Sequence, residues 1–413
     1  MDNLAHAVNS ENEWRLETPE PQGWGQSTHP AAANKYYMIS VDAHLMPPRD
    51  MFVKRMDTKW HDLLPRMEVR DGVRYLVTEG ARPHPLIEFT LSGEDEYRMK
   101  TGGTLPDPEK QEGEDISVRI ADQRADGIDG EVIFPNGPAL MMYASKNIEF
   151  VAAQCAAWND WAYEVCSPHW DFCNPVAAIA SADVNLAVKE VERVAKLGYR
   201  TLMLPCKPVF GPNNVSDPNY NLKMYDPMWA AIQEADLAIT YHVSTGMDPR
   251  GARSTGGAVI NYVIHSLAPT IEPIVNMCAS GVFERFPKLR AGTIEANAGW
   301  VPWMMASMDE AYRKHHMWVA PKMGGLPSDY YRQNCFASFG EDEAATFQAE
   351  HFGLQDNFMW ANDYPHHEGS WPHSAPAIER TFAANMSEET RRKVLGLNAA
   401  RVFKFDVPAK YKA

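Results

Sequence analysis

The sequence lacks the features that define several large classes of protein. No apolar run approaches the roughly 20 residues that a membrane-spanning helix needs, and the polar N-terminal segment has no apolar core of a secretion signal. The six cysteines form no C-x-x-C pair, so we expect reduced, buried thiols rather than a disulfide framework. These absences predict a cytoplasmic protein that does not enter a membrane.

An excess of positive charge is also missing. Acidic residues number 54 against 39 lysines and arginines, which leaves a formal charge of −15. Nucleic acids and anionic membrane surfaces bind clustered lysine and arginine, so neither is an expected partner. Hydrophobic residues make up 45% of the 413 residues and charged residues 23%, which is typical of a globular protein that can bury a sizeable core.

From residue 35 onward, short apolar runs alternate with helical patterns. Buried strands are predicted at residues 36–41, 130–135, 175–182, 201–205, 237–242, 290–295, 335–339 and 358–363. Helical periodicity lies between them, for example at residues 148–165, 186–197 and 227–235. Eight alternating strands and helices predict the α/β class and a distorted (β/α)8 TIM barrel. An open, doubly wound sheet is the main alternative, but no glycine-rich phosphate loop follows the first strand.

The expected barrel has additions at both ends and after its first strand. We expect the chain to consist of an N-terminal arm at residues 1–34, the barrel at residues 35–405 and a C-terminal tail at residues 406–413. The barrel contains an insertion at residues 53–120. Two β-like stretches, residues 72–77 and 85–90, predict a small β-subdomain in the insertion, placed as a lid or a subunit contact. Apolar residues in the arm and the insertion predict a homodimer.

Polar side chains follow four of the predicted strands. Asp42 and His44 come after strand one, His242 ends strand five, Glu295 ends strand six and Asp363 ends strand eight. Because the carboxyl ends of all barrel strands meet at one rim, we expect these groups to converge. Two carboxylates and two imidazoles, from Asp42, His44, His242 and Asp363, predict an open catalytic site for one divalent metal ion. Zinc is the first choice, with manganese or iron as alternatives.

Five ordered segments give the sequence a family likeness. They are residues 41–47 (VDAHLMP), 128–135 (IDGEVIFP), 281–290 (GVFERFPKLR), 299–303 (GWVPW) and 362–366 (NDYPH). With these segments the chain resembles the amidohydrolase superfamily, in the branch called amidohydrolase-related family 2 and typified by aminocarboxymuconate-semialdehyde decarboxylase. The resemblance covers almost the whole chain except the arm, and it implies a metal-dependent barrel enzyme.

The resemblance also implies roles for individual residues. The family's first-strand motif is H-x-H, with an acidic residue in place of the first histidine in several members, and Asp42 and His44 match that variant. His242 matches the strand-five ligand. Asp363 matches the strand-eight aspartate, which contacts the metal and acts as a general base. Glu295 stands where the family often has histidine, so it could bind the metal, act as an acid or base, or orient His242.

Four further residues are weaker candidates. His366 and His367 follow Asp363 on a loop that is expected to lie over the pocket, so His366 is assigned a catalytic role and His367 a substrate contact. Lys207 after strand four and Arg250 after strand five are candidates for binding a substrate carboxylate.

Two reactions remain open on this reasoning, both on a small carboxylated compound of aromatic or ring-cleavage origin. In the first prediction, a hydrolase, a metal-activated water attacks and Asp363 takes its proton. In the alternative, a non-oxidative decarboxylase of an aromatic or muconate-type acid, Asp363 or Glu295 delivers a proton and carbon dioxide leaves. A catalytically inactive scaffold would show gaps among the ligands, and none of the four is missing.

Overall fold

The structure is a computed structural model in which well over half of the chain is described. The described residues are 36–81, 83–86, 116–209, 217–245, 255–315, 317–366, 369–371, 373–382 and 386–411. The predicted N-terminal arm, Arg250 and His367 lie outside these residues.

Parallel strands form two sheets, ordered β1-β5-β6 and β12-β11-β10-β9-β8-β7. Their bounds are β1 Ile39–Leu45, β5 Gly130–Pro135, β6 Cys173–Pro175, β7 Ala177–Ala178, β8 Thr201–Leu204, β9 Ala238–His242, β10 Arg290–Ile294, β11 Cys335–Phe339 and β12 Phe358–Trp360. Only Val176 separates β6 from β7, and Ala43 in β1 forms a parallel bridge with Tyr364 beyond β12. This strand order is that of a distorted (β/α)8 barrel, with the ladder interrupted at these two junctions.

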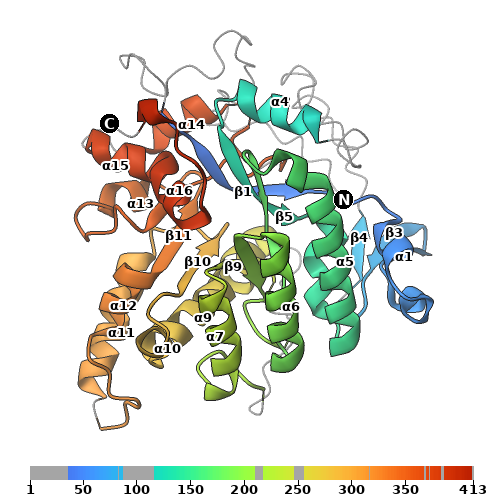
Figure 1. Ribbon diagram of the computed structural model, residues 1–413, viewed down its shortest axis with the longest axis horizontal. Helices are drawn as coiled ribbons and strands as arrows, with labels where there is room; N and C mark the ends of the chain where they lie inside the picture. Colours follow the sequence, from blue (N-terminus) through green and yellow to red (C-terminus); the bar gives the residue numbers. More distant parts are fainter. Residues whose placement is uncertain are drawn as a thin grey trace.

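The strands are short but almost completely buried. Every residue of β1, β5, β9 and β11 is buried, which explains their nearly continuous apolar sequences. Helices lie along the strands, as Figure 1 shows for α5, α6 and α7. The longer helices are α4 Ser117–Ala125, α5 Ile148–Cys166, α6 Val184–Leu197, α7 Asp226–Glu234, α9 Ala268–Ala279, α11 Val301–Lys314, α12 Pro327–Asn334, α14 Ser374–Thr381 and α16 Asn398–Phe403. None of the described helices is long and apolar enough to cross a membrane.

Local sequence signals fix where two of these helices begin. The Asn147 side chain accepts a hydrogen bond from the backbone N–H of Phe150 at the start of α5. Asp183 does the same for the first turn of α6, and Gly198 ends that helix in the left-handed region with φ 94°. Such caps satisfy backbone groups that a helix end leaves without partners.

A small antiparallel sheet lies between β1 and β5 in sequence, as predicted. It contains β2 Arg66–Arg70, β3 Val73–Val77 and β4 His84–Leu86, and it sits at the edge of the molecule beside α1 Met51–Arg55 (Figure 1). The turn between β2 and β3 is Asp71-Gly72, where both residues have positive φ, as a tight hairpin requires. The sequence analysis missed β2, whose alternation is obscured by its exposed, charged residues. Residues 87–90 of the predicted stretch lie outside the described part of the chain.

All six cysteines are buried and free, as expected from their apolar surroundings. Burial raises the pKa of Cys206 to about 11, and the Cys155 thiol is shifted in the same direction. All six cysteine side chains thus belong to the core.

Candidate metal centre

The first ligand pair lies within strand β1 and not just after it. Asp42 and His44 belong to β1, because the neighbouring strand β5 continues to Pro135 and pairs with the chain as far as Leu45. The pairing register shifts between Ser40 and Ala43, so β1 contains one more residue than β5 over this stretch. Such bulges re-aim side chains next to active sites.

Two histidines point their Nε2 atoms at the same place. The Nδ1 atom of His44 lies 3.1 Å from the carbonyl oxygen of Pro135, and that of His242 lies 2.8 Å from the carbonyl oxygen of Val243. A carbonyl oxygen only accepts hydrogen bonds, so each Nδ1 carries a proton and each ring turns its Nε2 toward the centre. This is the arrangement in which histidine binds a metal ion.

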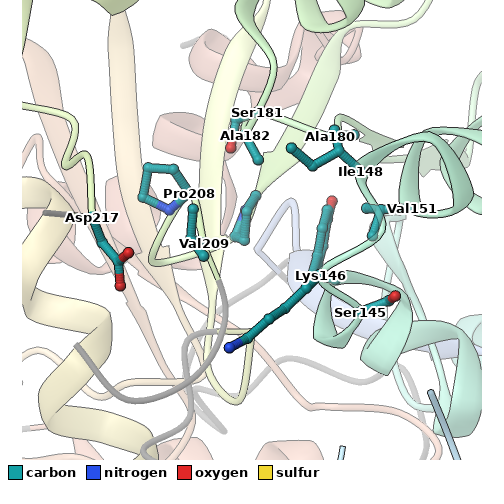
Figure 2. Close-up of a pocket in the computed structure, with 12 residues that line it drawn as sticks. Ser145, Lys146, Ile148, Val151, Ala180, Ser181, Ala182, Pro208, Val209 and Asp217 are labelled. Carbon is teal, nitrogen blue, oxygen red and sulfur yellow. The ribbon is translucent and has the colours of Figure 1, made fainter. Parts of the chain in front are cut away.

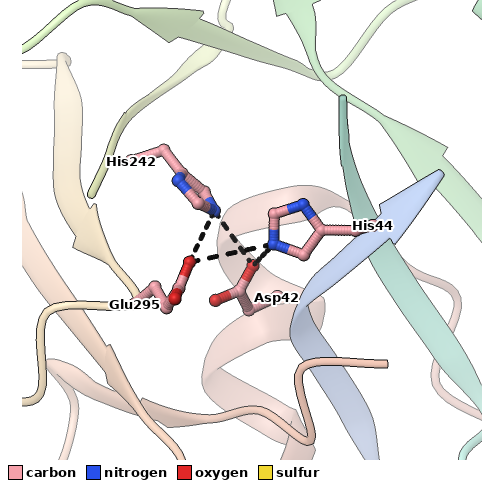
Figure 3. Close-up of side chains that lie close together, drawn as sticks. All are labelled: Asp42, His44, His242 and Glu295. Atoms are coloured by element: carbon pink, nitrogen blue, oxygen red, sulfur yellow. Dashed lines mark ion pairs between the residues drawn. The ribbon is translucent and has the colours of Figure 1, made fainter. Parts of the chain in front are cut away.

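Two carboxylates complete a compact group of four ligand atoms (Figure 3). The Asp42 Oδ1 atom lies 3.5 Å from His44 Nε2 and 3.4 Å from His242 Nε2. The Glu295 Oε2 atom lies 3.8 Å and 3.3 Å from the same two nitrogens. Ligand atoms that sit about 2.0–2.2 Å from one tetrahedral ion are about 3.3–3.6 Å apart, so the spacing fits a bound cation.

The hydrogen bonding of these atoms supports the same conclusion. His44, His242 and Asp42 are all buried, at 1% exposure or less. Their inward-facing atoms, Nε2 of each ring and Asp42 Oδ1, have no hydrogen-bond partner among the described residues. Buried polar atoms are rarely left in that state. A divalent cation is the group that would satisfy all three at once, so the residues fit a metal site.

Asp363 and His366 form the adjoining part of the centre. Asp363 Oδ1 lies 3.4 Å from His44 Nε2 and 3.0 Å from His366 Nδ1. The His366 ring stacks on the His44 ring with centroids 4.0 Å apart, and its Nε2 lies 3.3 Å from Asn136 Oδ1. A second possible ligand group therefore contains His44, Glu295, Asp363 and His366 and overlaps the first.

The backbone at the partly exposed members of the centre is unusual. Glu295 has φ 55° and Asp363 has φ 56°, and both lie just beyond the strand that leads to them. The predicted strands six and eight thus end one and three residues earlier than expected, at Ile294 and Trp360. Left-handed backbone is costly for residues other than glycine, and it is concentrated at functional sites.

Burial and charge shift the protonation of these groups. Burial lowers the pKa of His44 well below its ordinary value, and the nearby His366 and His242 rings act in the same direction. Burial also opposes protonation of His242, but the carboxylates of Asp42 and Glu295 outweigh it and raise its pKa. Burial raises the pKa of Glu295 well above its ordinary value, and the adjacent charge of Asp363 adds to this effect.

A cavity of about 410 Å³ opens onto the centre. Asp42, Glu295 and Asp363 are among the residues that line it, together with Tyr262 and Phe339. A cavity of this size beside a possible metal site suits a small molecule.

The predicted substrate-binding cation is not at this cavity. Lys207 is largely buried, and its Nζ lies 3.9 Å from Glu272 Oε2, so it faces an acidic partner on helix α9. Lys207 is not among the residues that line the cavity at the centre. The prediction that Lys207 binds substrate therefore has no contact to support it.

A second cavity, of about 210 Å³, lies beyond the ends of β7 and β8 (Figure 2). It is lined by Tyr143, Ser145, Lys146, Ile148, Val151, Ala180, Ser181, Ala182, Pro205, Pro208, Val209 and Asp217. In Figure 2 the Lys146 side chain extends from the α5 side toward the side where Asp217 lies. The sequence analysis missed this lysine, because it precedes a helix and follows no strand end.

Comparison with known proteins identifies the family. The family model described as amidohydrolase matches residues 41–405, most of the chain. The chain therefore belongs to the amidohydrolase family and is an enzyme of that superfamily, which confirms the resemblance seen in the sequence.

The individual proteins to which the chain is similar share a quarter or less of their aligned residues with it. The chain is 25% identical over 310 residues to gamma-resorcylate decarboxylase from Rhodococcus jostii (strain RHA1), covering 71% of this chain and 88% of the relative. Its fold is similar to that of an amidohydrolase from Mycobacterium avium subsp. paratuberculosis K-10, with a TM-score of 0.70 at 21% identity over 92% of this chain and 100% of the other. It is also similar to a dihydroxybenzoic acid decarboxylase from Polaromonas sp. JS666, which contains manganese and the inhibitor 2-nitroresorcinol. That match has a TM-score of 0.60 at 18% identity over 92% and 100% of the two chains.

Proposed function

We propose that this enzyme is a metal-dependent, non-oxidative decarboxylase of a small aromatic acid. The observation that carries the proposal is the state of Glu295 beside the ligand cluster. Its carboxyl group is 17% exposed and faces the cavity, with Oε2 3.3 Å from His242 Nε2, and its buried surroundings raise its pKa. A carboxyl group in this position can hold a proton and deliver it to a substrate in the cavity, and decarboxylation needs a proton donor where hydrolysis needs a base.

Asp42, His44 and His242 would hold the metal ion, and Asp363, whose Oδ1 lies 3.4 Å from His44 Nε2, would be the fourth ligand, as the sequence predicted, which leaves the neighbouring Glu295 for proton transfer. A divalent cation at this point supplies positive charge that attracts a carboxylate and stabilises the negative charge that develops on substrate oxygens. The carbonyl oxygens of Pro135 and Val243 already orient the two imidazoles. Little reorganisation is then needed when the ion binds.

The proton comes from Glu295 in this proposal. Glu295 transfers it to the ring carbon that carries the carboxylate, the bond between that carbon and the carboxylate breaks, and carbon dioxide leaves. The electron pair of the broken bond restores the aromatic ring, so no oxidant or reductant is required. Tyr262 and Phe339 line the cavity in which the ring would lie.

His366 is proposed to position other residues of the same site. Its Nδ1 faces Asp363 and its Nε2 faces Asn136 Oδ1, while its ring covers His44. We assign His366 the tasks of orienting Asp363 and excluding water from one side of the ligands.

The hydrolase that the sequence favoured first is the competing proposal. It would use Asp363 as a general base toward water, and the position of Asp363 in the cavity wall is compatible with that role. The names of the relatives favour decarboxylation, which the sequence analysis kept as its alternative.

The deciding experiment is incubation of the manganese-loaded enzyme with gamma-resorcylate and related hydroxybenzoic acids in D₂O. Decarboxylation predicts release of carbon dioxide and one deuterium at the ring carbon that lost it. Methyl esters and amides of the same acids form the parallel set. Hydrolysis of these compounds, without carbon dioxide from the free acids, would contradict the proposal and favour the hydrolase.

Three sequence-based predictions remain proposals. Zinc was the expected metal, whereas the Polaromonas enzyme contains manganese, so both ions belong in the metal analysis. The homodimer and the cytoplasmic location also stay predictions. Sedimentation and cell fractionation test them.

A further inference from the structure

Helix α4 places two buried polar residues under the metal centre. Arg119 and Gln123 are four residues apart, so they lie on the same face of the helix. Arg119 is 5% exposed and Gln123 fully buried, and both bind Glu131 in strand β5, which is also fully buried. Charged and amide groups are seldom buried without a specific arrangement of partners.

Arg119 connects Glu131 with the segment that carries His44. Its Nε and Nη2 atoms donate to the two carboxylate oxygens of Glu131, at 2.6 and 2.9 Å. Its remaining terminal nitrogen, Nη1, donates to the backbone carbonyl oxygen of His44. The guanidinium carbon also lies 4.9 Å from the centroid of the Tyr364 ring, one residue beyond Asp363.

Gln123 connects the same glutamate with the segment that carries Asp363. Its Nε2 donates to Glu131 Oε2 at 2.8 Å, and its Oε1 accepts from Asn362 Nδ2 at 2.7 Å. The backbone N–H of Asn362 donates to Ser40 Oγ at 3.0 Å, and that hydroxyl donates to the carbonyl oxygen of Asp42 at 2.7 Å. The segment after β12 is therefore tied to β1 through Ser40, in addition to two backbone bonds, from Asp363 N–H to the Asp42 carbonyl oxygen at 3.1 Å and from His44 N–H to the Tyr364 carbonyl oxygen at 2.6 Å.

We propose that Arg119 and Gln123 are positioning residues that set the separation between the ligands of β1 and the ligand Asp363, with Glu131 as their common anchor. The proposal rests on the metal site put forward above. The β1 and β12 segments meet through an isolated bridge at Ala43 and Tyr364 and not through a continuous ladder. The hydrogen bonds from α4 supply part of the restraint that a longer ladder would provide.

The chemistry of the two side chains suits this task. Arginine offers three differently directed donors in one plane, which lets a single side chain hold a carboxylate and a carbonyl oxygen at fixed angles. Lysine keeps the charge but loses that planar geometry. Methionine in place of Gln123 keeps much of the volume but removes the bonds to Glu131 and Asn362.

The test is the affinity of chelator-treated protein for Mn²⁺, measured by electron paramagnetic resonance of the free ion. Arg119→Lys and Gln123→Met are each expected to weaken Mn²⁺ binding about tenfold or more, the size found when residues that orient metal ligands are changed. Thermal unfolding of the metal-free proteins, recorded in parallel, shows whether each variant is folded. If Arg119→Lys does not fold, Gln123→Met, which removes no charge, decides the question.

Arg285→Lys is the matched control. The Nε and Nη2 atoms of Arg285 donate to the two carboxylate oxygens of Asp226, and its Nη1 donates to the backbone carbonyl oxygens of Ser280 and Gly281, but Arg285 lies outside the centre. This variant is expected to lower stability and leave Mn²⁺ affinity unchanged. Folded Arg119 and Gln123 variants that bind Mn²⁺ as tightly as wild type would overturn the inference and leave the proposed function standing. Wild-type protein that binds no Mn²⁺ would remove the metal site, and both proposals would fail.

Discussion

The centre has two halves that differ in backbone and exposure. Asp42, His44 and His242 lie inside strands, are buried, and do not have positive φ. Glu295 and Asp363 lie beyond the ends of their strands, in left-handed backbone, with side chains 17% and 13% exposed. In the proposed site the strand-held half would hold the cation, and the other half reaches the cavity where a substrate would lie.

This difference suggests a division of labour. Atoms that bind an ion must keep their spacing, and residues in a buried strand are the most restrained in a protein. A group that exchanges a proton with a substrate needs access to the cavity and a pKa shifted by its surroundings. Asp363 stands between the two roles, because it approaches His44 and also lines the cavity.

The largest effect is expected in the strand-held half. His242→Asn removes an Nε2 ligand that no other described side chain replaces, so Mn²⁺ binding should weaken by more than the ~10–100-fold seen for residues behind the ligands, and turnover should fall below detection. Titration of chelator-treated protein with Mn²⁺ measures the affinity. His351→Asn, an exposed histidine, is the control and should behave as wild type. Undiminished Mn²⁺ binding by His242→Asn would show that the ion sits elsewhere.

The next largest effect is expected to distinguish the roles of Glu295 and Asp363, the two acidic residues of the more exposed half. Glu295→Gln removes the proposed proton donor and should lower the decarboxylation rate by about 10²–10⁴-fold, the usual contribution of general acid catalysis. Its Mn²⁺ affinity should change only a few-fold, since four other ligands remain. Asp363→Asn should instead weaken Mn²⁺ binding strongly.

The decarboxylation rate and the Mn²⁺ affinity are measured in parallel for Glu295→Gln and Asp363→Asn, and the two variants are compared. Glu310→Gln, at an exposed position of helix α11 away from the cavity, is a control that should leave both quantities nearly unchanged. Equal loss of Mn²⁺ affinity in Glu295→Gln and Asp363→Asn would mean that Glu295 is itself a metal ligand. The proposed difference in role between the two halves would then be wrong.

Most of the strand-held half could be predicted from the sequence. Asp42 and His44 are two residues apart in an apolar run, and His242 ends another, so the period of a strand and the shared rim of a barrel bring them together. The bulge in β1 could not be predicted, because it depends on pairing with β5, about ninety residues further along the chain. It shifted the pair from after the strand to inside it without separating the two side chains.

The exposed half was predicted less completely. The residues Glu295 and Asp363 were identified, but their strands were extended to include them, since no local signal marks left-handed backbone at an acidic residue. The roles of Arg119 and Gln123 were also out of reach. Both occur in a polar helical stretch, and only the tertiary structure shows that they bind a buried glutamate beneath the ligands.

The smallest effect is expected at Asp126, a buried carboxyl group that contacts Asn362, the residue before Asp363. Burial raises the pKa of Asp126 to about 7, although hydrogen bonds from Ser374 and Asn362 oppose the shift. The folded protein therefore binds this proton more tightly than the unfolded chain, and the stability it contributes at low pH is lost as the pH rises toward 7. Between about pH 5 and about pH 8 the loss is about 3 kcal/mol, because about two pKa units at ~1.4 kcal/mol each lie in that window. Urea unfolding of wild type and Asp126→Asn at the two pH values measures it. The wild type should lose this stability relative to the variant, because the amide of the variant does not titrate. If both proteins show the same pH dependence, Asp126 is already ionised in the folded protein. The contact between Asp126 and Asn362, next to Asp363, would then not depend on pH in this range.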